Sequence, residues 1–399
     1  MPIYEGSRAL RNDEWILLQI KEGPCSAGCE YCYENAQIRT ILGAAQTAGV
    51  VEAGPLNELS TLQLAQLSNK YRDRVGIEMS LDQVESIFTL LRQAGFARAG
   101  LIGSEPSTHR QFNAILDSAL ANNMELLVYT AGLTPRTMQH PAIKFVVLHL
   151  DYGWMGIDER TRRLEAGILP SPSYMKDIEI LLQAEKEIHL RVNFSSSELT
   201  ETNLVYNFFS QIHPNLLKQT CLKYSFNTRV SGDASVAYET PDTLRSKAHV
   251  LREFIDRFVA TFPDVKLLSE RPLFPCSFDK MTWNTYVQRG GFLSSCDMEY
   301  TFYPNEGLAL CPPSRNLVAP KSPSNPTELR EQLLELRLYL EAMYKIPSFD
   351  CCESCELRKD LSCQGGCLGY KSGRAQSFGD KNVHRRLIPV SALARSTTS

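Results

Sequence analysis

The stretch WILLQIKEGPCSAGCEYCYENAQ, residues 15–37, joins an apolar run to a loop with three cysteines. The run WILLQI, residues 15–20, has the length and composition of a buried β-strand. Cys25, Cys29 and Cys32 follow it closely. Thiolates at such spacing bind iron-sulfur clusters or zinc, and a closed structural site takes four ligands. Because the nearby sequence offers no fourth cysteine and no histidine, we interpret the loop as a site with one open metal position.

Apolar runs alternate with amphipathic helical segments over the first 230 residues. Six runs are predicted as strands, at residues 15–20, 97–105, 124–132, 143–151, 187–195 and 221–230. Parallel neighbours need crossover connections, so this alternation predicts an α/β fold with a parallel sheet. Six units are too few for a closed eight-stranded barrel. We therefore expect an open or partial (β/α)6 barrel, with the chemistry at the carboxyl ends of its strands.

The composition narrows the class of protein. The chain has 399 residues, 43% hydrophobic and 22% charged, and a net charge of -3, which gives no sign of nucleic-acid binding. No apolar stretch approaches the roughly 18 residues of a membrane span, and no signal peptide precedes residue 15. Twelve cysteines without an export signal favour metal or redox chemistry in a reducing compartment. We therefore expect a cytoplasmic protein that binds neither nucleic acid nor membrane.

Two motifs carry a family resemblance. CSAGCEYC resembles the C-x3-C-x-aromatic-C motif of radical S-adenosylmethionine (radical SAM) enzymes, with Tyr31 at the aromatic position. LIGSEPSTHRQF resembles their G-G-E-P motif, with serine where a glycine is usual. The resemblance implies that a ledge receives the methionyl amino group of SAM and that Glu105 is its charge partner. The ledge consists of Gly103, Ser104, Glu105 and Pro106.

The resemblance also implies the cofactors and the chemistry. The three cysteines of the loop would hold a 4Fe-4S cluster whose fourth iron binds SAM. RVNFSSSE resembles the strand that faces the ribose and the methionyl carboxylate, so Arg191, Asn193 and Ser195 are candidate contacts. One electron from the cluster would split SAM into methionine and a 5'-deoxyadenosyl radical, which abstracts hydrogen from a C–H bond.

A second group of cysteines resembles the SPASM extension of these enzymes, which usually binds two auxiliary 4Fe-4S clusters. By position, one cluster would take Cys276, Cys296, Cys311 and Cys367. Cys352, Cys355 and Cys363 would give three ligands to the other. Candidates for its fourth ligand are Cys351, Asp380 and His384, and an open position is the further alternative. The alternative is a single zinc ribbon from Cys352, Cys355, Cys363 and Cys367.

The resemblance covers nearly the whole chain and predicts its division. We expect a barrel over residues 1–230 with an insertion at 36–79, a helical linker over 231–275, a SPASM-like domain over 276–375 and a basic tail over 376–399. The barrel strands begin too early to leave room for a leader-binding domain. A separate leader-binding protein is therefore expected if the substrate is a peptide with a leader.

The resemblance favours modification of a ribosomally synthesised peptide by crosslinking, epimerisation or excision, with flavodoxin or ferredoxin as electron donor. Alternatives are a small-molecule natural-product intermediate as substrate, or a non-enzymatic electron-transfer or zinc module. The sequence names no catalytic base. Candidates for the substrate cavity are His109, His149, Asp151, Tyr152, Arg160 and Arg162, of which Asp151 and Tyr152 end a strand and are favoured.

Overall fold

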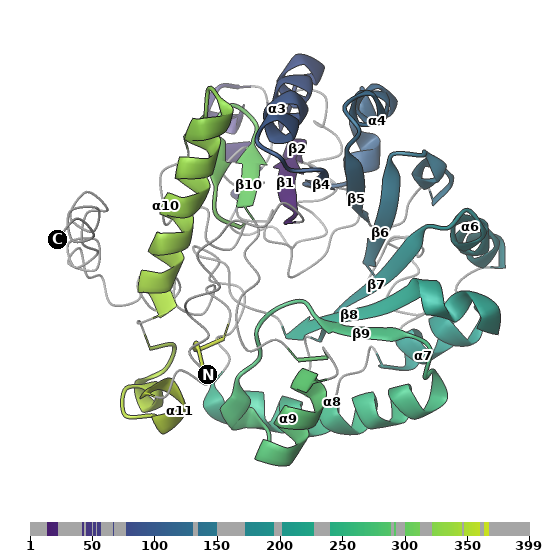
Figure 1. Ribbon diagram of the computed structural model, residues 1–399, viewed down its shortest axis with the longest axis vertical. Helices are drawn as coiled ribbons and strands as arrows, with labels where there is room; N and C mark the ends of the chain where they lie inside the picture. Colours follow the sequence, from purple (N-terminus) through teal and green to yellow (C-terminus); the bar gives the residue numbers. More distant parts are fainter. Residues whose placement is uncertain are drawn as a thin grey trace.

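The fold is known from a computed structural model (Figure 1). It describes residues 14–22, 42–43, 45–49, 51–52, 54–56, 67, 77–130, 135–149, 172–194, 202–226, 240–288, 291–292, 300–311, 321–344, 347–359 and 363–366. Most of the predicted insertion lies outside these residues, as does the predicted tail.

Six parallel strands form the barrel and confirm the prediction. They are β1 (Ile16–Gln19), β4 (Arg98–Ile102), β5 (Glu125–Thr130), β6 (Ile143–His149), β7 (Glu187–Phe194) and β8 (Thr220–Phe226). Each pairs in parallel with the next in chain order. Figure 1 shows them as an arc with helices on its outer side. Their carboxyl ends therefore meet at one edge of the sheet, as parallel pairing requires.

The described helices begin and end with clear sequence signals. The longer ones are α3 (Leu81–Gln93), α4 (Phe112–Ala121), α6 (Pro172–Gln183), α7 (Thr202–Ser210), α8 (Pro241–Thr261), α9 (Lys280–Gln288) and α10 (Pro326–Tyr344). The Ser80 side chain accepts a hydrogen bond from the Gln83 amide at 3.2 Å and so caps the start of α3. Among the described helices, none is both long and apolar enough to cross a bilayer.

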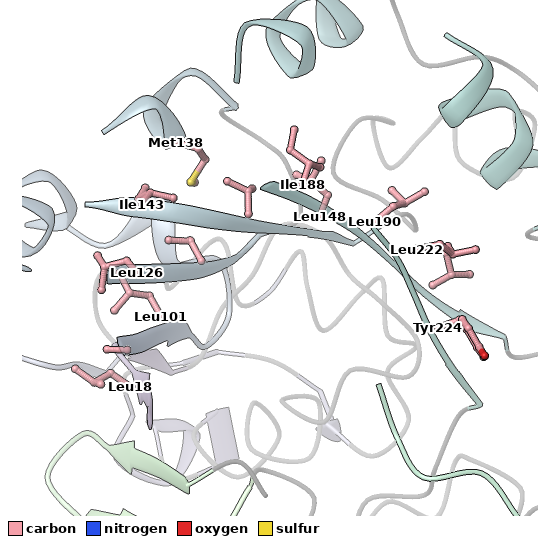
Figure 2. Close-up of a cluster of buried hydrophobic side chains, with 14 of the residues drawn as sticks. Leu18, Leu101, Leu126, Met138, Ile143, Leu148, Ile188, Leu190, Leu222 and Tyr224 are labelled. Atoms are coloured by element: carbon pink, nitrogen blue, oxygen red, sulfur yellow. The ribbon is translucent and has the colours of Figure 1, made fainter. Parts of the chain in front are cut away.

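The core lies between the sheet and these outer helices. Ile188, Leu190, Val192 and Phe194 alternate along β7 and are all buried. Figure 2 shows equivalent side chains from neighbouring strands gathered in one apolar layer. Each fully buried Leu or Ile contributes about 1.5–3 kcal/mol, so this layer stabilises the arc. The intervening side chains of each strand face the concave interior, where polar groups collect.

Three further strands extend the sheet and were not predicted. They are β9 (Lys266–Ser269), β10 (Tyr300–Tyr303) and β11 (Gly307–Ala309), and the sheet order is β11-β10-β1-β4-β5-β6-β7-β8-β9. β9 pairs with β8, although the sequence predicted a helical linker there. β10 pairs in parallel with β1 and so brings residues of the predicted SPASM-like segment to the barrel. The division into domains stays a prediction.

A two-stranded sheet and several short helices complete the described structure. β2 (Lys21–Glu22) pairs antiparallel with β3 (Ile77–Glu78) in a two-stranded sheet. The short helices are η2 (Pro106–Thr108), η3 (Pro135–Gln139), η5 (Pro214–Gln219), η6 (Pro275–Ser277), η8 (Asp350–Cys352) and α11 (Glu356–Lys359). β2 matters most for function, because the cysteine loop begins directly after it.

Candidate active site

The predicted ledge follows β4 at the carboxyl edge of the sheet. Glu105 is only 1% exposed. Its carboxylate accepts hydrogen bonds from the Thr130 hydroxyl at 2.9 and 3.0 Å and from the Ser107 hydroxyl at 2.6 Å. The Ser107 amide also donates to it at 3.2 Å, which caps η2. Glu105 is therefore a fixed, buried carboxylate and not a solvated loop residue.

The backbone of the ledge adopts a conformation that favours glycine. Gly103 has φ +100° and Ser104 has φ 39°. A Cβ on Gly103 would lie 2.1 Å from the carbonyl oxygen of Lys21, so the ledge packs directly against β2. The serine at position 104 keeps the left-handed backbone that a glycine would adopt at lower cost. The chain that enters the cysteine loop thus lies against the ledge.

Lys21 ties these segments together. It is 2% exposed, and its ammonium donates to the Thr108 carbonyl at 3.1 Å and to the Thr108 hydroxyl at 3.0 Å. It also forms an ion pair with Glu78 of β3 at 3.2 Å. These hydrogen bonds and the ion pair compensate for the free-energy cost of burying the ammonium charge. Lys21 therefore fixes β2, β3 and η2 in one arrangement at the entrance to the cysteine loop.

His109, a candidate for the substrate cavity, has a structural role here. Its Nε2 donates to the Met79 carbonyl at 3.0 Å, and its Nδ1 accepts from the Gln111 amide at 3.0 Å. Burial lowers the pKa of His109, so the ring is neutral near pH 7. Both ring nitrogens are engaged, which leaves neither for proton transfer. His109 therefore links the end of the ledge to Met79, which lies between β3 and α3.

A second polar group lies on the interior face of β5 to β9. We call it the basic layer, and it consists of Tyr129, His149, Arg191, Lys223 and Glu270. Arg191 pairs in register with both His149 and Lys223. Its guanidinium forms a buried ion pair with Glu270 and donates to His149 Nε2 at 2.7 Å. The layer is therefore a connected network near the carboxyl edge.

Burial and neighbouring charges set the protonation of the basic layer. Burial, followed by the Arg191 charge, lowers the pKa of His149 to about 3, so the ring is neutral and accepts the hydrogen bond from Arg191. Burial alone would raise the pKa of Glu270, but Arg191, Lys223 and Arg271 lower it below its ordinary value. His149 is thus held as an acceptor and Glu270 as a carboxylate, which makes His149 a poor general base.

Replacing Glu270 by leucine is expected to lower the free energy of unfolding by about 3–5 kcal/mol, because Arg191 would remain buried without its anion. Chemical denaturation measures this change. The double variant Arg191→Met/Glu270→Leu should recover most of the loss. In the wild type, stability should fall as the pH drops below the ordinary carboxyl pKa of 4.5, because the depressed pKa of folded Glu270 stabilises the fold only above it. If the single and double variants were equally stable, the expected cost of leaving Arg191 buried without its anion would be contradicted.

Four described cysteines of the second group converge from three segments of the chain. Cys276 lies in η6, Cys352 ends η8, and Cys355 and Cys363 flank α11. Partial burial, and after it the thiols of Cys363, Cys352 and Cys355, raise the pKa of Cys276 to about 11. The resemblance placed Cys276 with a different set of cysteines. We call these four the cysteine quartet.

Aromatic packing explains how Cys276 reaches the others. The rings of Phe274 and Phe349 lie 5.3 Å apart between centroids. A Cβ on Gly366 would lie 2.5 Å from the Phe274 ring, so the ring sits directly on this glycine. The Gly365 amide donates to Cys363 Sγ at 3.3 Å, as amides around metal-bound thiolates commonly do. The segment before Cys276 is thereby fixed against the segments that carry the other three thiols.

The described cysteines do not form a site for a single metal ion. Within the described ranges, no three His, Cys, Asp or Glu side chains are grouped so that they could hold a single metal ion. A cubane cluster binds each thiolate to a different iron and so takes a wider spacing. The seven described cysteines are all free thiols, and Cys221 is buried alone on β8.

Several predicted residues lie outside the described part of the chain. They are Cys25, Cys29, Tyr31, Cys32, Asp151, Tyr152, Arg160, Arg162, Ser195, Cys296, Cys367, Asp380 and His384. The backbone of Asn193 belongs to β7. Cys311 follows β11, and Cys351 is exposed beside Cys352. The roles assigned to all these residues stay predictions.

Sequence reasoning missed several residues of the described site, among them Thr130, Lys223 and Glu270. Thr130 ends β5 and lies near the end of the predicted strand at 124–132, and a polar residue at that place next to the ledge strand is a usable signal. Lys223 alternates with apolar residues in β8, where an ordinary half-buried strand gives the same pattern. Glu270 follows a strand of four residues that was not predicted, so its place could not be inferred.

Comparison with known proteins rests on structure alone. Sequence comparison finds no matching protein family and no matching curated protein. The fold matches Streptococcus suis SuiB bound to S-adenosylmethionine, at 11% identity and a TM-score of 0.50 over 87% of this chain and 71% of SuiB. It matches anSMEcpe with bound AdoMet and Cp18Cys peptide at 12% identity and a TM-score of 0.52, over 95% of this chain and 99% of that protein. These matches confirm the fold that the resemblance to radical SAM enzymes predicts.

Proposed function

We propose that the protein is a radical SAM enzyme that modifies a peptide. One observation carries the proposal: the strand leading into Cys25, Cys29 and Cys32 packs against a ledge that presents the buried carboxylate of Glu105. A three-thiolate loop and a fixed anion at one edge of a parallel sheet suit a metal with an open position and a ligand with an ammonium group.

The residues of the chain have distinct roles in this proposal. The three cysteines hold a 4Fe-4S cluster, which when bound would supply the electron that splits SAM into methionine and a 5'-deoxyadenosyl radical. Glu105 receives the methionyl ammonium, and Gly103 allows the ledge to approach β2 closely, just before the loop begins. Arg191, Asn193 and Ser195 contact the ribose and the methionyl carboxylate. The arc and its loops exclude water from the reacting C–H bond.

The substrate is proposed to be a ribosomally synthesised peptide, which the enzyme crosslinks, epimerises or cleaves. A protein of the same fold, anSMEcpe, is known with a bound peptide, and this supports a peptide substrate here. A separate leader-binding protein and flavodoxin or ferredoxin as electron donor complete the proposal. The free thiols of the described cysteines are consistent with a reducing cytoplasm.

Anaerobic reconstitution with iron and sulfide, followed by incubation with SAM and dithionite, tests this function. We expect formation of 5'-deoxyadenosine and methionine. The mass change of a peptide product then identifies the reaction: a loss of two hydrogens for a crosslink, no change for epimerisation, and a larger loss for excision. A protein fully loaded with iron that forms no 5'-deoxyadenosine would overturn the proposal.

We further propose that the cysteine quartet holds one complete auxiliary cluster, with Cys276 as the fourth ligand that the run from Cys352 to Cys363 lacks. This assignment replaces the candidates Cys351, Asp380 and His384. Cys296, Cys311 and Cys367 would then remain for a second auxiliary cluster. The packing of Phe274 against Phe349 and Gly366 supports the assignment.

Replacing Cys276 by alanine is expected to lower the iron content of the reconstituted protein by up to about four atoms per chain, the content of one cubane cluster. Iron is counted together with the charge-transfer absorbance of the cluster. The matched control is Cys221→Ala, which removes a buried lone thiol from β8 and should leave the iron count unchanged. If the iron content and the absorbance of Cys276→Ala were unaltered, Cys276 would not be a cluster ligand.

A further inference from the structure

Thr130 joins the third barrel strand to the ledge. It ends β5 and is 2% exposed. Its hydroxyl lies 2.9 Å from Oε1 and 3.0 Å from Oε2 of Glu105, so one proton is shared between the two carboxylate oxygens. A donor that is almost equally far from both oxygens restricts the rotation of the carboxylate as well as its position. The contact therefore sets the orientation of Glu105.

The ledge also holds Glu105 by itself, but in a different way. The Ser107 hydroxyl donates to Oε1 at 2.6 Å, and the Ser107 amide donates to the same oxygen at 3.2 Å. Both contacts span two residues, so they move with the ledge. The Thr130 contact spans 25 residues and comes from another strand. Of these three donors, Thr130 is the one that fixes the carboxylate relative to the sheet.

The sheet in turn holds Thr130. The residue pairs in register with Leu148 of β6, and on its other side β5 pairs with β4, the strand that leads into the ledge. The side chain is β-branched, which restricts its rotation about χ1. The hydroxyl is therefore a rigid reference point for the Glu105 side chain at the carboxyl edge of the barrel.

We propose that Thr130 is a positioning residue for SAM, because it orients the Glu105 carboxylate towards the methionyl ammonium. The inference rests on the proposed function, in which Glu105 receives that ammonium. An ion pair that is buried from water is favourable only in good geometry, since its attraction must exceed the cost of removing both charges from water. Thr130 should therefore raise the affinity for ligands that have the ammonium group and leave the affinity for ligands without it unchanged.

The test compares S-adenosylhomocysteine, which has the amino-acid group of SAM, with 5'-methylthioadenosine, which lacks it. Equilibrium dialysis measures the binding of each to the reconstituted protein, and 5'-deoxyadenosine formation from SAM is measured in the same preparation. Thr130→Val removes the hydroxyl at nearly constant shape, and Thr130→Ser keeps it. The matched control is Thr301→Val in β10. Thr301 is also buried, but within the part of the chain that the structure describes its hydroxyl makes no hydrogen bond.

Thr130→Val should bind S-adenosylhomocysteine about tenfold more weakly than the wild type, because a hydrogen bond to a charged group is lost. Its affinity for 5'-methylthioadenosine should stay within about twofold, as expected if the nucleoside site is intact. Thr130→Ser and Thr301→Val should bind both nucleosides like the wild type. Glu105→Gln should bind S-adenosylhomocysteine weakly, and adding Thr130→Val to it should cause no further loss, because Thr130 acts through Glu105.

A Thr130→Val variant that binds S-adenosylhomocysteine as tightly as the wild type would overturn the inference. So would a variant that loses both nucleosides equally, because Thr130 would then only support the fold. Losses that add up in the double variant with Glu105→Gln would also overturn it. Equal binding of both nucleosides to the wild type would remove the proposed role of Glu105 and the inference with it. Absence of 5'-deoxyadenosine with the expected binding pattern intact would count against the proposed function alone.

Discussion

A variant with Cys25, Cys29 and Cys32 all replaced by alanine is expected to form no 5'-deoxyadenosine. The proposed cluster has no other thiolates in that loop, and without it no electron reaches SAM at the ledge beside Glu105. Chromatography of anaerobic reactions with dithionite measures the nucleoside. The expected effect is complete loss of turnover, larger than that of any single contact to SAM.

The iron content distinguishes this loss from general damage. The triple variant should keep the iron of the auxiliary clusters and lose only about four atoms per chain. Cys221→Ala serves as the matched control, since it removes a thiol from the barrel without touching either proposed cluster region. Nucleoside formation at the wild-type rate by the triple variant would disprove the proposed role of the loop.

Replacing Gly103 by alanine is expected to lower the free energy of unfolding by about 3 kcal/mol. The backbone at φ +100° disfavours any side chain, and the new Cβ would meet the backbone oxygen of Lys21 at 2.1 Å. Because that oxygen belongs to β2, the clash also shifts the entrance of the cysteine loop. We expect weaker SAM binding together with the lower stability, measured by equilibrium dialysis and by chemical denaturation.

Gly54→Ala is the control for this prediction, because no atom lies within 4 Å of a Cβ at that position. It should leave stability and SAM binding unchanged. If Gly103→Ala were as stable as Gly54→Ala and bound SAM equally well, the close approach of the ledge to β2 would have no functional importance.

The barrel could be predicted from the sequence because its strands are long apolar runs separated by helical segments. Each of the six was confirmed within a few residues of its predicted bounds. β9, β10 and β11 were missed because they have only three or four residues each. All residues of β10 and β11 are buried, so no alternation marks them as strands. They are defined by pairing with distant strands, which local periodicity does not report.

The site could be predicted only where a short motif marks it. The segment from Gly103 to Pro106 was identified by resemblance. The structure adds the reason for its glycine, which is a positive φ and a close approach to the backbone of Lys21. Glu270 could not be assigned, because it acts through Arg191, a partner far away in the sequence. Cys276 could not be assigned correctly either. Its position in the sequence grouped it with Cys296, Cys311 and Cys367, whereas the packing of Phe274 brings it near Cys352, Cys355 and Cys363.

The pairing of β1 with β10 has a consequence for synthesis of the chain on the ribosome. Ile16 pairs with Tyr300, so the first barrel strand lacks one of its neighbours until most of the protein has been made. Until then β1 is an apolar edge strand, the kind that aggregates with other chains. Glu14 and Arg337, paired at 2.7 Å, meet equally late. Nascent chains that stall before residue 300 should therefore depend on chaperones, and the folding rate should reflect these distant contacts.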